Sequence, residues 1–269
     1  MGEASNNWTQ VIGIVGGLGP HAHLAFERHL LEASGPIDTE QEYPQWILVS
    51  SPSTPDRTAC IRGKGPSPVK ALTRSLETLQ AAGADFAVIA CNAAHYFLPS
   101  LLNILPILDI VAAGLRAGMK GLRHNDAIGV LATTGTLMAK VYQDTASKLG
   151  FVTPLRTLLD LPGGPDLQEG LVMEPIYGSG EDGNLRGLKQ GVIGEVGAQN
   201  KARLREAAQR LVEAGSRSVI MGCTEIPLAL QQADVPGIPL IDPLVSAATA
   251  AVAIARGKGS REALVGASR

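Results

Sequence analysis

The chain has 269 residues, a formal net charge of −2 and 45% hydrophobic residues. This length allows one large or two small domains. The charged residues are scattered, which excludes a polybasic nucleic-acid surface and an acidic tail. No apolar run approaches the roughly 20 residues of a membrane-spanning helix, and the polar start, Met1–Gln10, lacks a signal-like apolar core. We therefore expect a cytoplasmic protein that binds neither nucleic acid nor membranes.

The predicted elements of the first half alternate between strands and helices. An apolar strand runs into a glycine-rich turn within Val11–Pro20. A helix, a strand, a Ser/Pro-rich loop, an amphipathic helix, a strand carrying a cysteine and a short strand follow, in this order: His21–Ala33, Trp46–Ser50, Ser51–Thr58, Val69–Ala82, Ala84–His95 and Ile104–Ile110. The βαβαβ order predicts a mostly parallel sheet with helices on both faces.

The pattern restarts after Asp126, where Ala127–Thr136 again predicts a strand and a turn of small residues. A helix, a strand, a long loop, a helix, a second cysteine-bearing strand, a short strand and a helix are then expected, in this order: Lys140–Leu149, Phe151–Leu155, Pro162–Asn184, Asn200–Ala214, Ser218–Pro227, Ile238–Asp242 and Pro243–Ala255. The long loop holds one helical turn around Val172–Ile176 in this prediction. The last residues, Gly257–Arg269, are expected to fray.

The two halves repeat one another in sequence. Ala82 and Gly83 precede Cys91 by the same interval at which Ala214 and Gly215 precede Cys223. The downstream segments also match, with a shift of one residue: Pro106–Asp109 and Pro239–Asp242. This repeat predicts an α/β fold of two similar domains, each a mostly parallel sheet flanked by helices, related by pseudo-twofold symmetry.

The predicted first domain comprises residues 1–115 and 225–269 and carries Cys91. The second comprises residues 116–224 and carries Cys223. Each cysteine ends an apolar run, which is how a parallel strand delivers a side chain to the carboxyl edge of a sheet. In a pseudo-twofold arrangement the two thiols face each other across a cleft. The third cysteine, Cys60, has no such context, and we interpret it as a packing residue.

Two facing thiols suit acid–base chemistry. A cysteine at a strand end just before a helix gains from the helix dipole and from free N–H groups, which lower the thiol pKa from about 8.5. A thiolate on one face of a substrate removes a proton from carbon, and a thiol on the other face returns one. The carbon is inverted without a metal, a Schiff base or a nucleotide.

Six segments resemble motifs of the cofactor-independent aspartate/glutamate racemases, on the aspartate racemase branch, and together they cover roughly Val11 to Ala255. In order, they are Ile14–Pro20, Pro55–Thr58, Cys91–His95, Leu131–Thr136, Ile176–Tyr177 with Leu188–Gly191, and Gly222–Pro227. The resemblance implies an amino-acid racemase whose acid–base pair is Cys91 and Cys223. Its substrate would be a dicarboxylic amino acid, aspartate before glutamate.

The resemblance also implies how that substrate is bound. One pair would bind carboxylates through charge-assisted bonds, and four polar side chains would hold the α-carboxylate and its developing charge: Arg57 and Lys189, and Asn92, Thr133, Thr136 and Thr224. Glu225 would position the substrate ammonium or polarise Cys223. Cys223 would serve the L-enantiomer and Cys91 the D-enantiomer. The resemblance implies no cofactor and no metal, and it implies a homodimer.

The sequence departs from the family motif at Ala93, where a threonine is usual, so one hydroxyl beside Cys91 is lost. This departure bears on the substrate more than on the reaction. His21 and His23 stand where acidic and small residues are common, and we expect surface or supporting roles for them. For His95 two interpretations stay open, a satisfied core histidine or a residue that tunes Cys91.

Other interpretations use the same residues. Gly13, Gly16 and Gly19 do not have the Gly-x-Gly-x-x-Gly spacing of a dinucleotide fingerprint, so we interpret them as letting the backbone approach a small ligand. Asp109 and Asp242 are expected to cap helices or brace the domains rather than to act in catalysis. The alternative functions are a related isomerase, a decarboxylase or hydantoin racemase of the same superfamily, or a non-catalytic amino-acid-binding protein.

Overall fold

The structure, a computed structural model, describes residues 8–123, 125–178, 186–191, 195–260 and 263–266. The chain divides into two compact units. The first is Met1–Ala113 with Leu244–Arg269, and the second is Gly114–Pro243. The return to the first unit therefore begins at Leu244, whereas the predicted boundary near residue 225 lies inside the second unit. Within the described ranges, no helix has both the length and the apolar character needed to cross a membrane.

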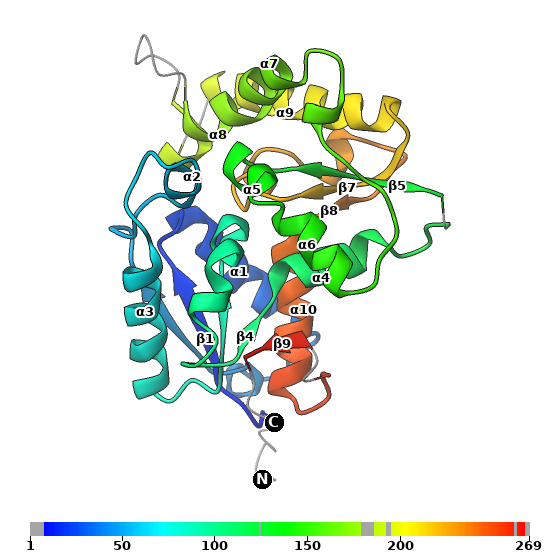
Figure 1. Ribbon diagram of the computed structural model, residues 1–269. Coiled ribbons are helices and arrows are strands. Elements are labelled where there is room, and N and C mark those ends of the chain that lie inside the picture. The colour runs from blue at the N-terminus through cyan, green and yellow to red at the C-terminus, as the bar shows by residue number, and fades with distance from the viewer. Residues whose placement is uncertain (1–7, 124, 179–185, 192–194, 261–262, 267–269) are drawn as a thin grey trace. The chain divides into compact units, whose positions relative to one another are not determined.

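The first unit is built on a five-stranded sheet in the order β2-β1-β3-β4-β9 (Figure 1). Its strands are β1 (Ile12–Gly16), β2 (Trp46–Ser50), β3 (Phe86–Ile89), β4 (Ile107–Leu108) and β9 (Leu264–Val265). The first four are parallel, and β9 pairs antiparallel with β4. The helical segments are α1 (Pro20–Ala33), η1 (Glu40–Glu42), α2 (Arg57–Ile61), α3 (Val69–Ala81), η2 (Asn92–Ser100), α4 (Ile110–Gly118), which continues into the second unit, and α10 (Pro243–Ala255).

The second unit holds a four-stranded, fully parallel sheet in the order β6-β5-β7-β8 (Figure 1). Its strands are β5 (Ala127–Leu131), β6 (Leu155–Arg156), β7 (Ser216–Met221) and β8 (Leu240–Ile241). Its helical segments are α5 (Thr134–Met138), α6 (Val141–Lys148), η3 (Leu158–Asp160), α7 (Gly164–Gln168), η4 (Glu169–Met173), α8 (Glu174–Tyr177), η5 (Leu188–Gln190), α9 (Glu195–Glu213), η6 (Ile226–Leu228) and η7 (Gln232–Asp234).

The four parallel strands of each sheet have the same order, which matches the repeat in the sequence. Strands β1, β3 and β5 are buried along their whole length. Continuous burial is expected of parallel strands covered by helices on both faces, and it explains why these runs are apolar without alternation. The predicted α/β class, with mostly parallel sheets flanked by helices, is confirmed.

Each cysteine at a strand end belongs to the core of its own unit. In the first unit, Leu72, Leu76 and Leu79 of α3 are fully buried in a cluster that also contains Cys91. In the second unit, one face of α9 packs into a cluster that contains Cys223. The i, i+4, i+7 spacing of the α3 leucines thus puts one helical stripe against the sheet, as an amphipathic helix requires.

The predicted loop Pro162–Asn184 is largely wrong, because residues 164–177 form a helical run of α7, η4 and α8. The residues that suggested a loop mark helix starts: Gly163 has φ 71° before α7, and Pro165 and Pro175 stand in first turns. Residues 179–184 of that prediction lie outside the described residues. The prediction that the C-terminus frays is also wrong at β9, which pairs with β4.

The η4 segment is a π-helix, with hydrogen bonds between residues five apart. Pro175 lacks the N–H that would bond the carbonyl of Leu171 in a regular α-helix. The wider turn brings residues five apart, such as Gln168 and Met173, onto one face of the run. This face matters below, because it contacts a turn at the edge of the sheet.

Candidate functional site

Ligands of open α/β sheets bind beyond the carboxyl ends of the strands, where the connections diverge to the two sides. In the first unit this point lies between β1 and β3, with β2 and β4 outside them. Val15 pairs with Ile89 at the ends of these strands, so the glycine-rich turn and Cys91 emerge at the same edge.

The second unit has the equivalent point between β5 and β7. Leu131 pairs with Met221, and the N–H of Gly222 donates to the Leu131 carbonyl at 2.6 Å. The Thr133–Thr136 turn and Cys223 therefore emerge together. The candidate residues thus fall into two groups, one in each unit: Arg57, Cys91 and Asn92, and Thr133, Thr136, Lys189, Cys223, Thr224 and Glu225.

The glycine-rich turn is packed too tightly for side chains. A Cβ on Gly16 would lie 2.7 Å from the ring of His23, and Gly17 has φ +82° with the Ser51 backbone against it. The Gly17 N–H donates to Nδ1 of His23 at 3.1 Å. Burial lowers the pKa of His23, so its ring stays neutral and keeps Nδ1 as an acceptor. His23 therefore supports the turn from the inside, as expected of a supporting residue.

Arg57 is the first residue of α2 and is buried, whereas the sequence places it in a loop. Asp56 caps this helix, because its Oδ1 accepts the N–H of Ala59 at 2.8 Å. The guanidinium of Arg57 donates to the carbonyls of Leu18 at 2.5 Å and Pro55 at 3.1 Å. Arg57 thus ties the glycine-rich turn to the Ser/Pro-rich loop, and its predicted role toward a carboxylate stays a prediction.

Cys91 is 7% exposed and precedes η2, which is a 3₁₀-helix. Its carbonyl accepts hydrogen bonds from Nδ1 of His95 at 3.0 Å and from the Ala94 N–H at 3.3 Å. Asn92 is buried beside it at 1% exposure. The local geometry around Cys91 is therefore fixed through its main chain.

Cys223 is held through its side chain. Its Sγ donates to Oε2 of Glu225 at 3.0 Å, and Oγ1 of Thr224 donates to the same oxygen at 3.3 Å. All three residues are buried. This thiol–carboxylate pair arises because the two side chains are two positions apart in a tight turn.

Burial raises the pKa of Cys223 well above its ordinary value, and the charge of Glu225 raises it further, while the charge of Lys189 lowers it. The expectation that a helix dipole lowers this pKa is wrong. The following helix, η6, has only three residues, so its dipole is small. At neutral pH Cys223 is therefore a protonated thiol, which suits a proton donor.

The Thr133–Thr136 turn begins α5, and its two hydroxyls lie 3.0 Å apart. A brace that the sequence did not reveal holds this turn from outside. Nε2 of Gln168 donates to the Ala132 carbonyl at 2.8 Å, and the Thr134 N–H donates to Sδ of Met173 at 3.2 Å. Both contacts come from the α7–η4 run. The sequence pattern predicted a loop for this segment and therefore did not indicate these contacts.

Lys189 lies in η5, and its Nζ is 4.6 Å from the centre of the Tyr177 ring. Its charge also acts on Cys223, as described above. The lysine predicted to bind carboxylate therefore belongs to the same electrostatic environment as the second cysteine. Within the part of the chain that the structure describes, no three His, Cys, Asp or Glu side chains are grouped so that they could hold a metal ion.

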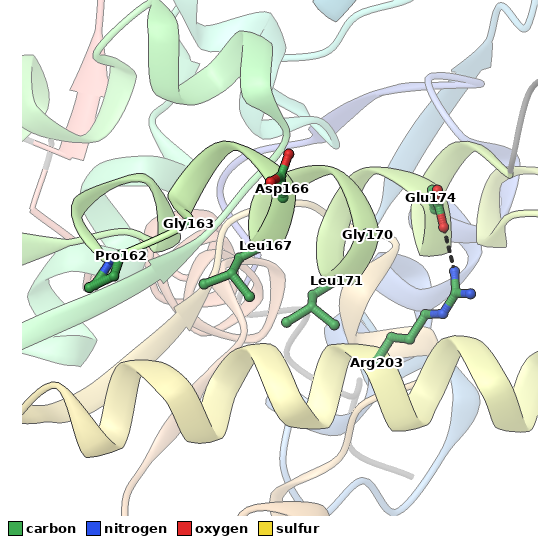
Figure 2. A pocket seen from close by; sticks show the side chains of 8 residues that line it. All are labelled: Pro162, Gly163, Asp166, Leu167, Gly170, Leu171, Glu174 and Arg203. Carbon is green, nitrogen blue, oxygen red and sulfur yellow. Dashed lines mark hydrogen bonds and ion pairs between the residues drawn. The ribbon is translucent and has the colours of Figure 1, made fainter.

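A groove of about 430 Å³ lies between the α7–η4–α8 run and α9, away from the cysteine turns in sequence. Figure 2 shows Leu167 and Leu171 pointing from the run toward α9, with Glu174 paired to Arg203 at 2.6 Å. Both charged side chains are one-third exposed. The groove contains no predicted site residue and no nucleophile. The cysteine turns therefore remain the candidate site.

Residues 15–251 match the model of the family described as Asp/Glu/Hydantoin racemase. Among solved structures, the aspartate racemase of Picrophilus torridus is similar with a TM-score of 0.69 and 20% identity, covering 94% of this chain and 97% of that one. An aspartate racemase homologue from Pyrococcus horikoshii OT3 has a TM-score of 0.65 and 23% identity, covering 92% of this chain and 99% of that one. At such identities these two likenesses establish the fold.

A glutamate racemase of Latilactobacillus sakei subsp. sakei (strain 23K) is 28% identical over 168 residues. The match covers 60% of this chain and 53% of that protein. It therefore spans about half the length of this curated relative.

Proposed function

The chain belongs to the Asp/Glu/Hydantoin racemase family, and from this premise we propose that it racemises an acidic amino acid, aspartate before glutamate, without a cofactor. The resemblance found in the sequence is thereby confirmed at the level of the family, whose named relatives are racemases and hence isomerases. The observation that carries the proposal is the equivalent placement of Cys91 and Cys223. Each follows one of the two inner strands among the four parallel strands of its sheet, at their carboxyl edge.

The proposed reaction is a two-base proton transfer at the α-carbon. The Cys91 thiolate takes the α-proton of one enantiomer, and the C–H electron pair moves into the substrate as a carbanion delocalised over the α-carboxylate. The Cys223 thiol gives its proton to the opposite face and becomes a thiolate. The product is the other enantiomer, and no atom is gained or lost. The raised pKa of Cys223 supports its assignment as the donor in this direction.

The reverse direction needs the opposite protonation of the pair. Cys223 must then begin as a thiolate, and Oε2 of Glu225 already accepts its hydrogen bond at 3.0 Å. In our proposal this thiolate is the one that the forward direction leaves, with the second proton on Cys91. Glu225 then accepts the hydrogen bond of the Cys223 thiol that forms when Cys223 takes the α-proton. We assign the L-enantiomer to Cys223 and the D-enantiomer to Cys91.

Substrate binding completes the proposal. Lys189 binds one carboxylate of the substrate, which its electrostatic coupling to Cys223 supports. Arg57 serves the other half of the site and also fixes the glycine-rich turn. The α-carboxylate and its developing charge are held by four buried polar side chains: Asn92, Thr133, Thr136 and Thr224.

We further propose a homodimer, to be tested by light scattering coupled to size-exclusion chromatography.

The direct test is α-proton exchange and racemisation of each aspartate enantiomer in deuterated water, followed by chiral chromatography without added cofactor. Cys91→Ala and Cys223→Ala should each lower racemisation by about 10³-fold or more, because each removes one of the two proton carriers. Cys60→Ala is the matched control, since this cysteine lies outside both turns. Full turnover by either single variant would refute the two-base mechanism.

A second candidate is racemisation of a hydantoin, which the family description includes. Ala93 favours it, because the missing hydroxyl beside Cys91 leaves a less polar site than the usual threonine. Polarimetry with a 5-substituted hydantoin, compared with aspartate at equal concentration, separates the two. Faster loss of rotation with the hydantoin would replace our choice of substrate and leave the two cysteines in their roles.

A further inference from the structure

His95 lies four residues after Cys91 and has no part in the proposed proton transfer. Its side chain is 2% exposed. Nδ1 lies 3.0 Å from the Cys91 carbonyl, and a carbonyl oxygen only accepts, so Nδ1 carries the hydrogen. Nε2 accepts the N–H of Ile110 at 3.3 Å. The two contacts together select the neutral ring with its proton on Nδ1.

A charged group also lies near this ring, because Oδ1 of Asp109 is 3.8 Å from Nε2. The same oxygen accepts the N–H groups of Val111 at 2.9 Å and Ala112 at 3.0 Å, so it serves as the cap of α4, as predicted. Ile110 is the first residue of that helix. His95 therefore connects the Cys91 carbonyl to the N-terminal turn of α4.

We propose that His95 is the positioning residue of Cys91, a strut with a fixed tautomer that sets the direction of the thiol by holding its peptide group. Cys91 needs such a strut because Ala93 offers no side chain equivalent to Glu225, which anchors the other thiol. The 3₁₀-helix that follows has poorer hydrogen-bond geometry than an α-helix. The single N–H of His95 points to a carbonyl, so the ring does not donate to Sγ.

Two conservative variants separate the two bonds of the strut. In His95→Asn the amide nitrogen occupies the place of Nδ1 and keeps the donor to Cys91. In His95→Gln the amide reaches the place of Nε2, keeping the contact with Ile110 and losing that donor. We expect His95→Asn to retain kcat within about threefold, and His95→Gln to lose about 30-fold in kcat with KM within about twofold, since small misplacements of reacting groups are costly.

A second readout does not depend on catalysis. The rate of alkylation by iodoacetamide is followed separately at Cys91 and Cys223 by mass spectrometry of the intact, folded chain. We expect His95→Gln to speed alkylation of Cys91 by about threefold or more while Cys223 keeps its rate, because loosening one turn exposes only its own thiol. His95→Asn should behave like the unmodified chain, and His29→Asn on α1, outside the Cys91 turn, is the matched control.

The proposal rests on the proposed function only for its effect on kcat. The proposed role of His95 would be overturned if His95→Asn and His95→Gln had the same kcat and the same alkylation rates. It would also be overturned if the alkylation rates of Cys91 and Cys223 changed together. If the unmodified chain racemises nothing, the proposed function fails, and the alkylation rates still decide whether His95 positions Cys91.

Discussion

The turn Cys91–Asn92–Ala93 and the turn Cys223–Thr224–Glu225 occupy the same place in two sheets of the same strand order, yet they hold their thiols differently. One thiol donates to a buried carboxylate two residues on. The other thiol belongs to Cys91, whose carbonyl accepts a hydrogen bond from His95. Alanine stands two residues after it, at the position equivalent to Glu225. Topology was therefore kept between the halves while the partners of the thiols diverged. The two-base reaction that we propose needs one protonated and one ionised thiol at a time, and the buried carboxylate beside Cys223 favours its protonated form.

Removing the carboxylate should erase most of this difference. We expect Glu225→Gln to lower racemisation by about 100-fold, because a neutral amide accepts the thiol hydrogen bond more weakly than a carboxylate and orients Cys223 less firmly. The pKa of Cys223 should fall, since the charge of Glu225 is one of the causes that raise it. The ultraviolet absorbance of the thiolate, titrated in a Cys60→Ala, Cys91→Ala background, measures this shift. Glu206→Gln on α9 is the control, and a rise in the pKa would contradict our account.

The brace on the second turn should affect binding more than chemistry. Gln168→Leu keeps the size of the side chain and leaves the Ala132 carbonyl without its donor, which costs about 1–3 kcal/mol when the group is buried. We expect the KM for aspartate to rise about fivefold and kcat to change less, because in our proposal the threonine turn binds the substrate. Steady-state kinetics and urea unfolding test this, with Glu169→Gln on the same run as the control. An unchanged KM would remove the brace from the binding site.

The raised pKa of Cys223 also predicts a dependence of stability on pH. Folding favours the protonated thiol, so its contribution is complete below the unfolded pKa of about 8.5 and is lost as the pH rises from there toward the folded pKa. Above this pH, the free energy of unfolding should therefore decline less in Cys223→Ser than in the unmodified chain. The serine keeps a hydroxyl donor for Glu225. Urea titrations at about pH 8 and about pH 10 measure the difference. Identical declines in the two proteins would show that the thiol is not the group responsible.

The smallest effect is expected in the groove of Figure 2, which lies outside the cysteine turns. Glu174→Gln removes the ion pair with Arg203, which is one-third exposed and so is worth less than about 1 kcal/mol. Thermal unfolding should change little, and racemisation should stay within about twofold. A loss comparable to that of Glu225→Gln would mean that the groove and the cysteine turns are coupled.

Local patterns predicted much of the fold. Trp46–Ser50 forms β2 with the predicted bounds, and the leucine spacing of α3 gave its buried face. The prediction failed at residues 164–177, because proline and glycine at helix starts resemble loop composition. It also failed at β9, whose pairing with β4 joins residues far apart in the chain. Pairing partners of that kind are invisible to any local pattern.

The sequence by itself determined that each of the two cysteines lies at the end of a strand. A short apolar run predicts a buried strand, and the small residues that follow mark where it ends. It also determined the repeat and the family. Only the tertiary structure decided what each thiol contacts. The raised pKa of Cys223 depends on burial and on the direction of the Glu225 side chain, and the Gln168 brace joins residues 36 positions apart. These are properties of packing, which the order of residue types does not specify.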